Sequence, residues 1–535
     1  MIDAFAYLSA EVAGNVFSSV LKVAPMMDVD WLGLFTMQGL NVLLSLFVLA
    51  VGLFALVIVI LFVVDVVQTK DAVRRNYPVI GRFRYIFSTL GEFFRQYFFA
   101  MDREEMPFNR AEREWVDRSS KGHDNTVAFG STQNLRPVGT VIFVNCPFPT
   151  LEEDACPTPN VVIGKGCPNP YEPQSIMNIS GMSYGALSKP AVRALSKGAA
   201  MANCWLNTGE GALAPWHLEG NCDVVFQIGT AKYGVRDLDG KLDPVKLKAI
   251  ADLSQVKMFE LKMSQGAKPG KGGILPAAKV TPEISEIRGI PVGVPSISPN
   301  RHPEIDNVGQ LLDFLTKIRD ITGKPTGFKT VVGAYGWLER MCEEIHRRGE
   351  ACGPDFITID GGDGGTGAAP MALMDHVGLP LREALPMVVD ILDKYSLRQR
   401  IRVIASGKLI IPADVAWAYC AGADVVVSAR GFMFALGCIQ SMKCNKNTCP
   451  TGITTHDRRL QRGLDPEDKA VRVKNFVDGI RKGVGTIAHS CGVKHPRALK
   501  RYHCRIVQEN GRSLPMDVVY PPVEALVQYR VKEAV

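Results

Sequence analysis

Residues 402–431 read RVIASGKLIIPADVAWAYCAGADVVVSARG, and this segment carries the clearest signal of the fold. Two apolar runs, RVIAS and DVVVSA, have the length and composition of buried strands, and a helical pattern lies between them. The same alternation recurs upstream in SIMNIS (175–180), MFELKMS (258–264), FKTVV (328–332) and FITIDGG (356–362), with a helix expected after Ser188 and Pro190 in its first turn. Strands that alternate with helices predict an α/β fold with a parallel sheet.

The ends of these runs favour a closed barrel over an open sheet. Several runs end in glycine, serine or lysine, and (β/α)8 TIM barrels build their active sites from the loops that follow the strands. An open doubly wound sheet is the alternative, but no GxGxxG motif joins a strand directly to a helix. The sequence therefore predicts a TIM barrel.

Three glycine loops at these strand ends suit a phosphorylated cofactor. Gly407 follows one late strand and Gly431 follows the next, the pair of positions at which barrels commonly hold a phosphate. The run DGGDGGTG, residues 360–367, adds a loop whose backbone can approach a ligand closely. Any one of these loops alone would fit a plain turn, but three of them together favour a cofactor site.

Cys438, Cys444 and Cys449 lie within twelve residues of one another, just past the second phosphate loop. Thiolates suit iron–sulfur clusters, and Asn445, Asn447 and Pro450 favour the bends that bring three of them together. The spacing alone leaves a loop of free thiols equally open, since thirteen cysteines in 535 residues do not make a disulfide scaffold. Zinc is a weaker alternative because a fourth ligand is missing locally.

The composition is that of an ordinary folded protein, with 47% hydrophobic and 21% charged residues. A formal net charge of +7 would permit nucleic-acid binding, but the basic residues are dispersed and no recognised nucleic-acid motif occurs. Nucleic acid is therefore not an expected partner.

The amino-terminal part predicts a single membrane span at 43–64, within a segment free of charge from Trp31 to Val64. A buried core helix is the alternative, but soluble helices seldom run this long without a polar face. Basic residues follow the span and acidic residues precede it, which predicts a cytoplasmic body attached to the inner membrane. Residues 2–24 have some amphipathic character and leave a second membrane segment open.

Four regions follow from these patterns. We expect a membrane anchor at 1–68, a helical linker at 69–140, the barrel at 141–500 with the cysteine loop at 438–449, and a carboxyl-terminal extension at 501–535. The aromatic and arginine-rich part of the linker, residues 78–115, suits either packing on the body, which we favour, or the bilayer surface.

Five motifs in this order resemble the FMN-binding synthase domain of glutamate synthases over about residues 140–490. They are ISGMSYGALS, TGEGAL, ELKMSQGAKPGKGG, FITIDGGDGGTGAAP and CIQSMKCNKNTCPTGI. With its membrane anchor, the chain resembles the short bacterial FMN-binding glutamate synthase family proteins. The resemblance implies FMN at the mouth of a TIM barrel and a [3Fe-4S] cluster on Cys438, Cys444 and Cys449. It also implies reductive amination, in which a 2-oxo acid, foremost 2-oxoglutarate, reacts with ammonia or an amine.

The resemblance also assigns roles to individual residues. Lys262, Lys329 and Glu210 are the expected catalytic residues, with a lysine beside the flavin stabilising negative charge on the reduced ring. The expected cofactor-binding residues are Met182, Ser183, Gln265, Gly364, Gly365, Thr366, Gly407 and Gly431.

The substrate region departs from the family pattern. Lys268 and Arg288 match positions that bind the keto acid, and cations suit its two carboxylates. Where the family has a glutamine after a GEGG motif, this chain has GKGGIL, which places Lys271 and Ile274 in the pocket region. His302 is what remains of a histidine-rich family loop, with a structural role more expected than that of a general acid. These departures affect the substrate more than the cofactor.

The resemblance includes no amidotransferase or pyridine-nucleotide domain. We therefore expect ammonia or an amine from solution or a partner, and electrons from a ferredoxin-like or membrane-bound donor. Two other functions stay open: a membrane-tethered electron-transfer module without amino-acid synthesis, and an enzyme related to N-methylglutamate synthase.

Overall fold

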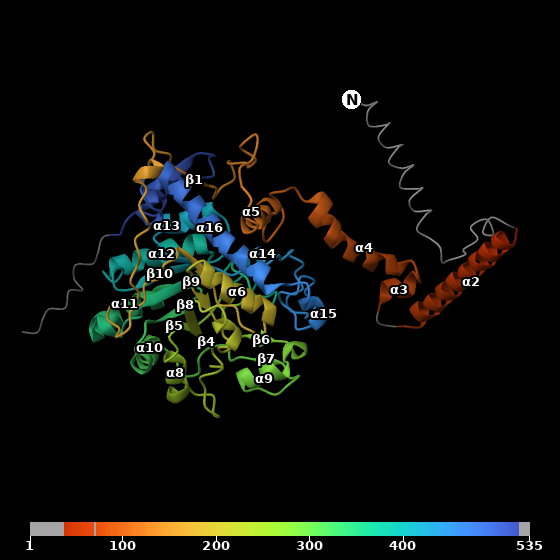
Figure 1. The fold of residues 1–535 in the computed structure, drawn as a ribbon, viewed down its shortest axis with the longest axis horizontal. Helices are drawn as coiled ribbons and strands as arrows, with labels where there is room; N and C mark the ends of the chain where they lie inside the picture. Colours follow the sequence, from red (N-terminus) through yellow and green to blue (C-terminus); the bar gives the residue numbers. More distant parts are fainter. Residues whose placement is uncertain (1–36, 69–70, 524–535) are drawn as a thin grey trace, which may run out of the picture. The chain divides into compact units, whose positions relative to one another are not determined.

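The computed structural model describes residues 37–68 and 71–523 of the chain, which forms two compact units at Met1–Met101 and Asp102–Val535 (Figure 1). Within the first unit, α2 spans Met37–Val67, and α3 (Ala72–Asn76), α4 (Gly81–Phe94) and the π-helical segment η2 (Arg95–Phe99) follow it. The segment Gly39–Val67 is long and apolar enough to cross a membrane. The question of a second membrane segment at 2–24 lies outside the described residues.

The second unit is built on a closed barrel of eight parallel strands, which confirms the predicted TIM barrel and excludes the open doubly wound sheet. The strands follow one another round the barrel in chain order. They are β2 (Met177–Ile179), β3 (Leu206–Asn207), β4 (Val224–Ile228), β5 (Val256–Lys262), β8 (Thr326–Thr330), β9 (Phe356–Asp360), β10 (Arg402–Ser406) and β11 (Val425–Ser428). Six of these overlap the quoted apolar runs, with β5 and β8 each beginning two residues before its run, whereas β3 and β4 were not expected as strands.

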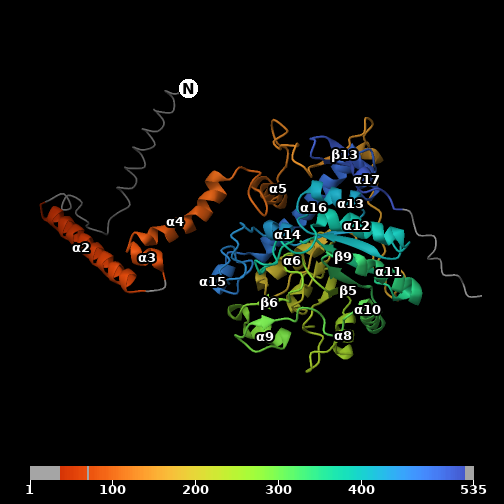
Figure 2. The same cartoon turned by 180° about the vertical axis from the view of Figure 1, so that it is seen from behind.

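Helices connect the strands and surround the barrel (Figure 2). The first, α6 (Lys189–Met201), begins as predicted, with the side chain of Ser188 accepting a hydrogen bond from Ala191 N and Pro190 in the first turn. The others are α7 (Pro215–Leu218), α8 (Pro244–Ala251), α10 (Val308–Thr322), α11 (Gly336–Arg348), α12 (Leu381–Lys394), α13 (Pro412–Cys420), α14 (Arg430–Ala435), α15 (Arg458–Gln461) and α16 (Pro466–Ser490).

Further elements precede the barrel in the sequence, follow it, or are inserted between β5 and β8. The insertion after β5 holds α9 (Pro282–Arg288) and an antiparallel pair, β6 (Ile274–Leu275) and β7 (Ser296–Ile297). Before the barrel, α5 (Arg110–Ser120) packs against α14 and α16. A three-stranded sheet joins β1 (Val141–Phe143), β12 (Cys504–Val507) and β13 (Ser513–Pro515), and α17 (Met516–Val519) follows it. Short 3-10 turns lie at 152–154, 277–279, 350–352, 496–498 and 501–503.

Much of the barrel interior is apolar, and several strands are nearly continuous hydrophobic runs because both of their faces are covered. Glu260 is also buried there and accepts hydrogen bonds from Asn207 and Thr358. Trp205, Met258, Phe356 and Ile404 belong to one buried cluster inside the barrel. Strand register then sets which polar residues become neighbours at the carboxyl ends. In particular, Lys262 of β5 pairs with Lys329 of β8.

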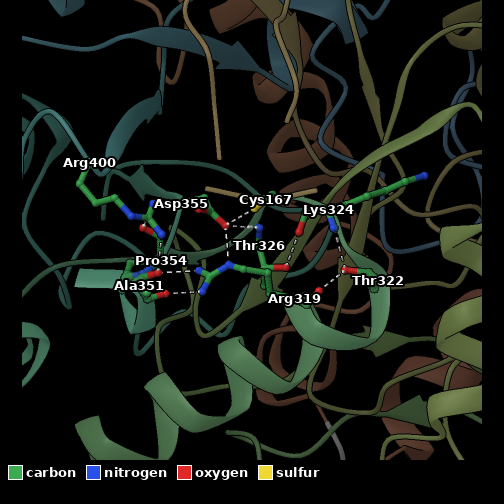
Figure 3. A network of polar contacts seen from close by, with 10 residues as sticks. Cys167, Arg319, Thr322, Lys324, Thr326, Ala351, Pro354, Asp355 and Arg400 are labelled. Carbon is green, nitrogen blue, oxygen red and sulfur yellow. Dashed lines mark hydrogen bonds and ion pairs between the residues drawn. The ribbon is translucent and has the colours of Figure 1, made fainter. Parts of the chain in front are cut away.

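A network of buried charges lies at the opposite, amino-terminal end of the strands (Figure 3). Asp355, immediately before β9, is fully buried and accepts hydrogen bonds from Arg319 Nε at 2.9 Å, Arg400 Nη1 at 2.8 Å and Thr326 N at 2.8 Å. The thiol of Cys167 donates to the same carboxylate at 3.5 Å. Because barrel active sites lie at the other end, this network serves stability.

Candidate active site

A polar pocket lies at the carboxyl ends of the barrel strands, where about 520 Å³ of empty space opens to solvent. Six residues expected from the sequence to act on or bind a cofactor line it together: Lys262, Gln265, Lys329, Gly364, Gly365 and Gly407. The tertiary structure therefore gathers these residues, which come from three strand ends and a glycine loop, around one cavity.

Two lysines on neighbouring strands, Lys262 and Lys329, contribute positive charge to the pocket. Lys329 Nζ lies 3.3 Å from Asp360 Oδ2 and 3.4 Å from Ser180 Oγ, so it is held close to the barrel wall. Lys262 Nζ lies 2.9 Å from Glu210 Oε1 and also donates to Gln265. Lys262 thus joins the cavity to Glu210, which does not line it.

Asp360, at the end of β9, holds the glycine loops in place. Its carboxylate accepts a hydrogen bond from Gly266 N at 2.8 Å and one from Ser406 Oγ at 2.7 Å. A side chain at position 266 would meet the carbonyl oxygen of Gly361 at 2.3 Å, so glycine is required where these two loops cross. One buried carboxylate therefore positions the loops after three strands.

The glycine positions keep the cavity open. A Cβ atom at Gly365 would approach the guanidinium of Arg430 to 2.8 Å, and Gly407 has φ +137°, which only glycine adopts without strain. Gly431 is buried beside the lining residue Arg430, and Thr366 follows the lining residue Gly365, but neither lines the cavity itself.

Several lining residues escaped the sequence argument. They are Ser180, Gln227, Ser406, Ser428 and Ala429, with Gly181 and Ile410, whereas Asp360, Lys408 and Arg430 belong to the glycine loops expected from the sequence. Gln227 interrupts the apolar strand β4 and Ser428 ends the apolar strand β11, and a polar residue at such a position was the available signal. Beneath the cavity, buried Glu260 accepts from Gln227 Nε2 at 2.6 Å and from Asn207 Nδ2 at 2.8 Å, which orients the Gln227 amide.

A second polar group adjoins the cavity and contains the residues expected to bind substrate. Glu210 is surrounded by Lys262, Lys268 and Arg288; burial opposes its charged form, yet these three cations hold the pKa of Glu210 below its ordinary value. Burial and repulsion from Lys262 lower the pKa of Lys268 to about 8. Burial also lowers the pKa of Arg288.

These two cations are short of partners. Lys268 is 4% exposed, and its ammonium makes a long hydrogen bond of 3.5 Å to the carbonyl oxygen of Gly272. Arg288 donates to the carbonyl oxygen of Tyr184 at 2.8 Å and to Ser183 Oγ at 3.4 Å, while its buried Nε atom has no partner among the described residues. Buried cations with unused donors are suited to an incoming anion.

The loop after β2 brings Met182 and Ser183 next to this group. Ser183 lies against Arg288 and against Gly209, where a Cβ atom would approach Ser183 N to 2.5 Å. Met182 is partly buried and packs on the hydrophobic core. Neither residue lines the cavity, but Gly181 directly before them does.

The remaining residues of the substrate region, His302, Lys271 and Ile274, are not among the cations that surround Glu210. His302 is fully buried, with its Nε2 atom 3.0 Å from the carbonyl oxygen of Lys262, and burial lowers the pKa of the ring to about 4. It therefore supports the end of β5 as a neutral side chain. Lys271 is exposed, and Ile274 lies in the β6–β7 pair.

The three cysteines lie in one loop after α14. Cys449 is buried, Cys438 and Cys444 are partly buried, and each of the three thiols is close enough to influence the charge of another. In the described part of the chain, no three His, Cys, Asp or Glu side chains are grouped closely enough to hold a single metal ion. An iron–sulfur cluster contains several metal atoms, so its thiolates need not converge on one point.

A buried lysine far away in sequence lies against this cysteine loop. Lys279 Nζ donates to the carbonyl oxygens of Cys444 at 2.8 Å and Ala186 at 3.2 Å. His456 Nε2 lies 2.9 Å from the carbonyl oxygen of Gly185, so it makes a second connection between the same two loops. The loop that follows β2 beside the cavity is therefore physically joined to the cysteine loop.

Fold and site together define a (β/α)8-barrel protein whose polar cavity lies at the carboxyl ends of the strands, next to a cysteine loop. The conserved region of glutamate synthase matches residues 149–494 of this chain. The chain belongs to the glutamate synthase family.

Two relatives illustrate the extent of this similarity. The glutamate synthase large subunit-like protein YerD of Bacillus subtilis is 38% identical over 89% of this chain and 98% of its own length. The archaeal-type glutamate synthase [NADPH] of Thermotoga neapolitana is 33% identical over 60% of each chain. The chain thus spans nearly all of the first relative but only about 60% of the second.

Solved structures are similar to the chain at a greater distance. The flavin-binding domain of flavocytochrome b2 from baker's yeast is 12% identical, with a TM-score of 0.43 over 77% of this chain and 83% of that domain. A likeness this distant has no bearing on the reaction.

Proposed function

We propose that this protein is an FMN- and iron–sulfur-dependent oxidoreductase of glutamate synthase type that reductively aminates a 2-oxo acid, with 2-oxoglutarate as the first candidate. The observation that carries the proposal is the adjacency of two unlike sites: a glycine-walled cavity with three lysines and an arginine, and a buried group of cations around Glu210. Lys262 belongs to both, because it lines the cavity and pairs with Glu210 at 2.9 Å.

The cavity has the chemistry that FMN requires. Gly364, Gly365 and Gly407 expose backbone to a ligand, and Lys408 and Arg430 at the same wall suit a phosphate. Lys262 and Lys329 suit the polar edge of a flavin, where a cation stabilises negative charge. Bound FMN would supply a hydride to the substrate, and the iron–sulfur cluster would supply electrons.

The group around Glu210 has the chemistry that a dicarboxylate requires. Lys268 and Arg288 would each bind a carboxylate, because both are buried and have unused donors. Glu210 stays ionised among its cations and would accept a hydrogen bond from the incoming amine nitrogen. Burial excludes bulk water from these contacts, which strengthens them.

The cysteine loop fits an iron–sulfur cluster in its donor set. Cys438, Cys444 and Cys449 offer three soft thiolates in one loop, and the ammonium of Lys279 lies beside it to balance their negative charge. We propose that these three residues hold a [3Fe-4S] cluster. A ferredoxin-like or membrane-bound donor would deliver electrons at this loop.

The first unit would anchor the protein in the inner membrane. The helix α2 supplies one segment of sufficient length and apolarity, and the excess of basic residues after it favours a cytoplasmic body. The proposal is therefore a single-pass membrane enzyme whose barrel faces the cytoplasm.

Anaerobic reduction of the full chain, purified in detergent, tests the reaction. After one equivalent of dithionite has been consumed, 2-oxoglutarate and isotope-labelled ammonium are added, and the flavin absorbance is followed. We expect the oxidised spectrum to return and labelled glutamate to appear in the mass spectrum. A flavin that stays reduced with every 2-oxo acid, in the presence of ammonium or methylamine, would show that the protein only transfers electrons.

A matched pair of lysine variants tests the substrate site. Lys268→Met removes a buried cation, whereas Lys271→Met removes an exposed one from the same loop. We expect Lys268→Met to raise the KM for the 2-oxo acid at least about tenfold, as loss of a charge-assisted hydrogen bond predicts, and to leave FMN content unchanged. Lys271→Met should behave as the unaltered protein, and equal effects of both substitutions would reject this site. Labelled N-methylglutamate formed from methylamine would instead change the assigned nitrogen donor.

A further inference from the structure

The helix α4 presents an apolar face that is exposed to its surroundings. Phe83, Ile86, Phe87 and Leu90 follow the i, i+3, i+4, i+7 spacing of one helical face, and their exposed fractions are 50%, 50%, 66% and 41%. Ser88 lies on the opposite face of the same helix. Exposed aromatic and aliphatic side chains in one row mark an interaction surface.

The first turn of α4 is attached to the carboxyl-terminal end of α2 by Asp65. This carboxylate is fully buried and accepts hydrogen bonds from Arg82 Nε at 2.8 Å, from Arg74 Nε at 2.9 Å and from Val79 N at 3.0 Å. Two arginines and one backbone amide thus surround a single charge. Asp65 lies two residues before the end of α2, so this clamp fixes where α4 begins relative to the apolar segment.

Close packing between α3 and α4 completes the clamp. A Cβ atom at Gly81 would approach the carbonyl oxygen of Val73 to 2.9 Å, so the start of α4 is in contact with α3. Asp71 caps α3 by accepting from Arg74 N at 3.1 Å. Hydrogen bonds to Asp65 and the close packing of Gly81 on α3 therefore define the geometry of the turn from α2 into α4.

We propose that α4 lies in the interfacial layer of the membrane leaflet at the carboxyl-terminal end of α2, with Phe83, Ile86, Phe87 and Leu90 in contact with acyl chains. The inference rests on the proposed insertion of α2 and adds a second, peripheral contact. The clamp holds the first turn of α4 at the level where the apolar segment ends, which is the level of the headgroups. Exposed Arg84, on the same helix beside the apolar face, suits anionic headgroups.

Photo-crosslinking of the full chain in vesicles of phosphatidylethanolamine and phosphatidylglycerol tests the contact. Benzoylphenylalanine replaces Phe87 in one protein, Leu90 in a second and Ser88 in a third. We expect lipid adducts at positions 87 and 90, and at least about fivefold less adduct at 88, because only the apolar face enters the acyl region. Adducts at 87 that join the barrel or a second copy of the chain instead of lipid would overturn the inference.

Clamp variants separate this contact from insertion of α2. With benzoylphenylalanine at 87, Asp65→Asn or Arg82→Gln should lower the lipid adduct several-fold, whereas Arg75→Gln, which removes an exposed charge outside the clamp, should lower it little. Resistance to carbonate extraction is measured in each variant. Protein that resists extraction but gives no lipid adduct at 87 contradicts the interfacial helix alone, and protein that is extracted contradicts the membrane anchor and the inference with it.

Discussion

The ammonium of Lys279 donates to the carbonyl oxygen of Cys444 at 2.8 Å, across 165 residues of sequence. Lys279 is 2% exposed and also contacts Ala186, in the loop that follows the first barrel strand. A buried cation with two carbonyl partners is well placed to act on the charge of the cysteine loop. It also ties this loop to the loop beside the cavity.

Replacing Lys279 should change the reduction potential of the proposed cluster. Burial lowers the pKa of Lys279 to about 8, so the residue is largely protonated at pH 7 and favours the more negative, reduced cluster. We expect Lys279→Met to make the midpoint potential more negative by at least about 40 mV, since even in a medium as polar as water one charge about 4 Å away contributes about 1 kcal/mol. The measurement is a redox titration at pH 7 followed by electron paramagnetic resonance.

Two further variants make the Lys279 experiment specific. Lys279→Arg keeps the charge and should recover most of the original potential, while Lys446→Met removes an exposed lysine of the cysteine loop and should have a small effect because water screens it. An unchanged potential in Lys279→Met would show that this lysine serves only to join the loops.

Cys444→Ser should prevent assembly of the cluster and leave most of the FMN in place, because the cysteine loop and the cavity draw on different residues. Iron and flavin content per chain are measured together. Cys156→Ser, an exposed cysteine outside the loop, should keep both groups. A full iron content in Cys444→Ser would contradict the ligand assignment.

Binding of the 2-oxo acid should weaken as the pH rises above about 8. Burial lowers the pKa of Lys268 to about 8 in the free protein, and a bound carboxylate raises it, so binding takes up a proton. The KM should therefore be constant below this pH and rise up to tenfold for each further pH unit. Lys268→Arg, which stays charged, should remove this limb of the pH profile, and persistence of the limb would assign it to another group.

Asp355→Ala should destabilise the barrel strongly. Its carboxylate is fully buried between Arg319 and Arg400, and its removal leaves buried Arg319 and partly buried Arg400 without their carboxylate partner. We expect a loss of about 3–5 kcal/mol in the free energy of unfolding. Asp306→Ala removes an exposed partner of Arg301 and should cost less than about 1 kcal/mol. Denaturant unfolding followed by tryptophan fluorescence compares the two, and similar midpoints would contradict the role of the network.

The sequence by itself determined the elements that depend on local chemistry. Apolar runs with polar ends predicted six of the barrel strands, because buried strands need continuous hydrophobic side chains. The glycines at 364, 365 and 407 marked cavity walls, because only glycine permits such close approach of backbone. The uncharged segment likewise indicated a helix of membrane-spanning length.

Only the tertiary structure decided which distant residues meet. Closure of the barrel and the register of its strands place Lys262 beside Lys329. The same closure sets Asp360 across from Gly266 and brings Lys279 to Cys444. The two-residue strand β3 was too short to leave a periodic pattern, although its Asn207 orients buried Glu260. Pairings of this kind depend on packing between elements far apart in the chain, and no local pattern records them.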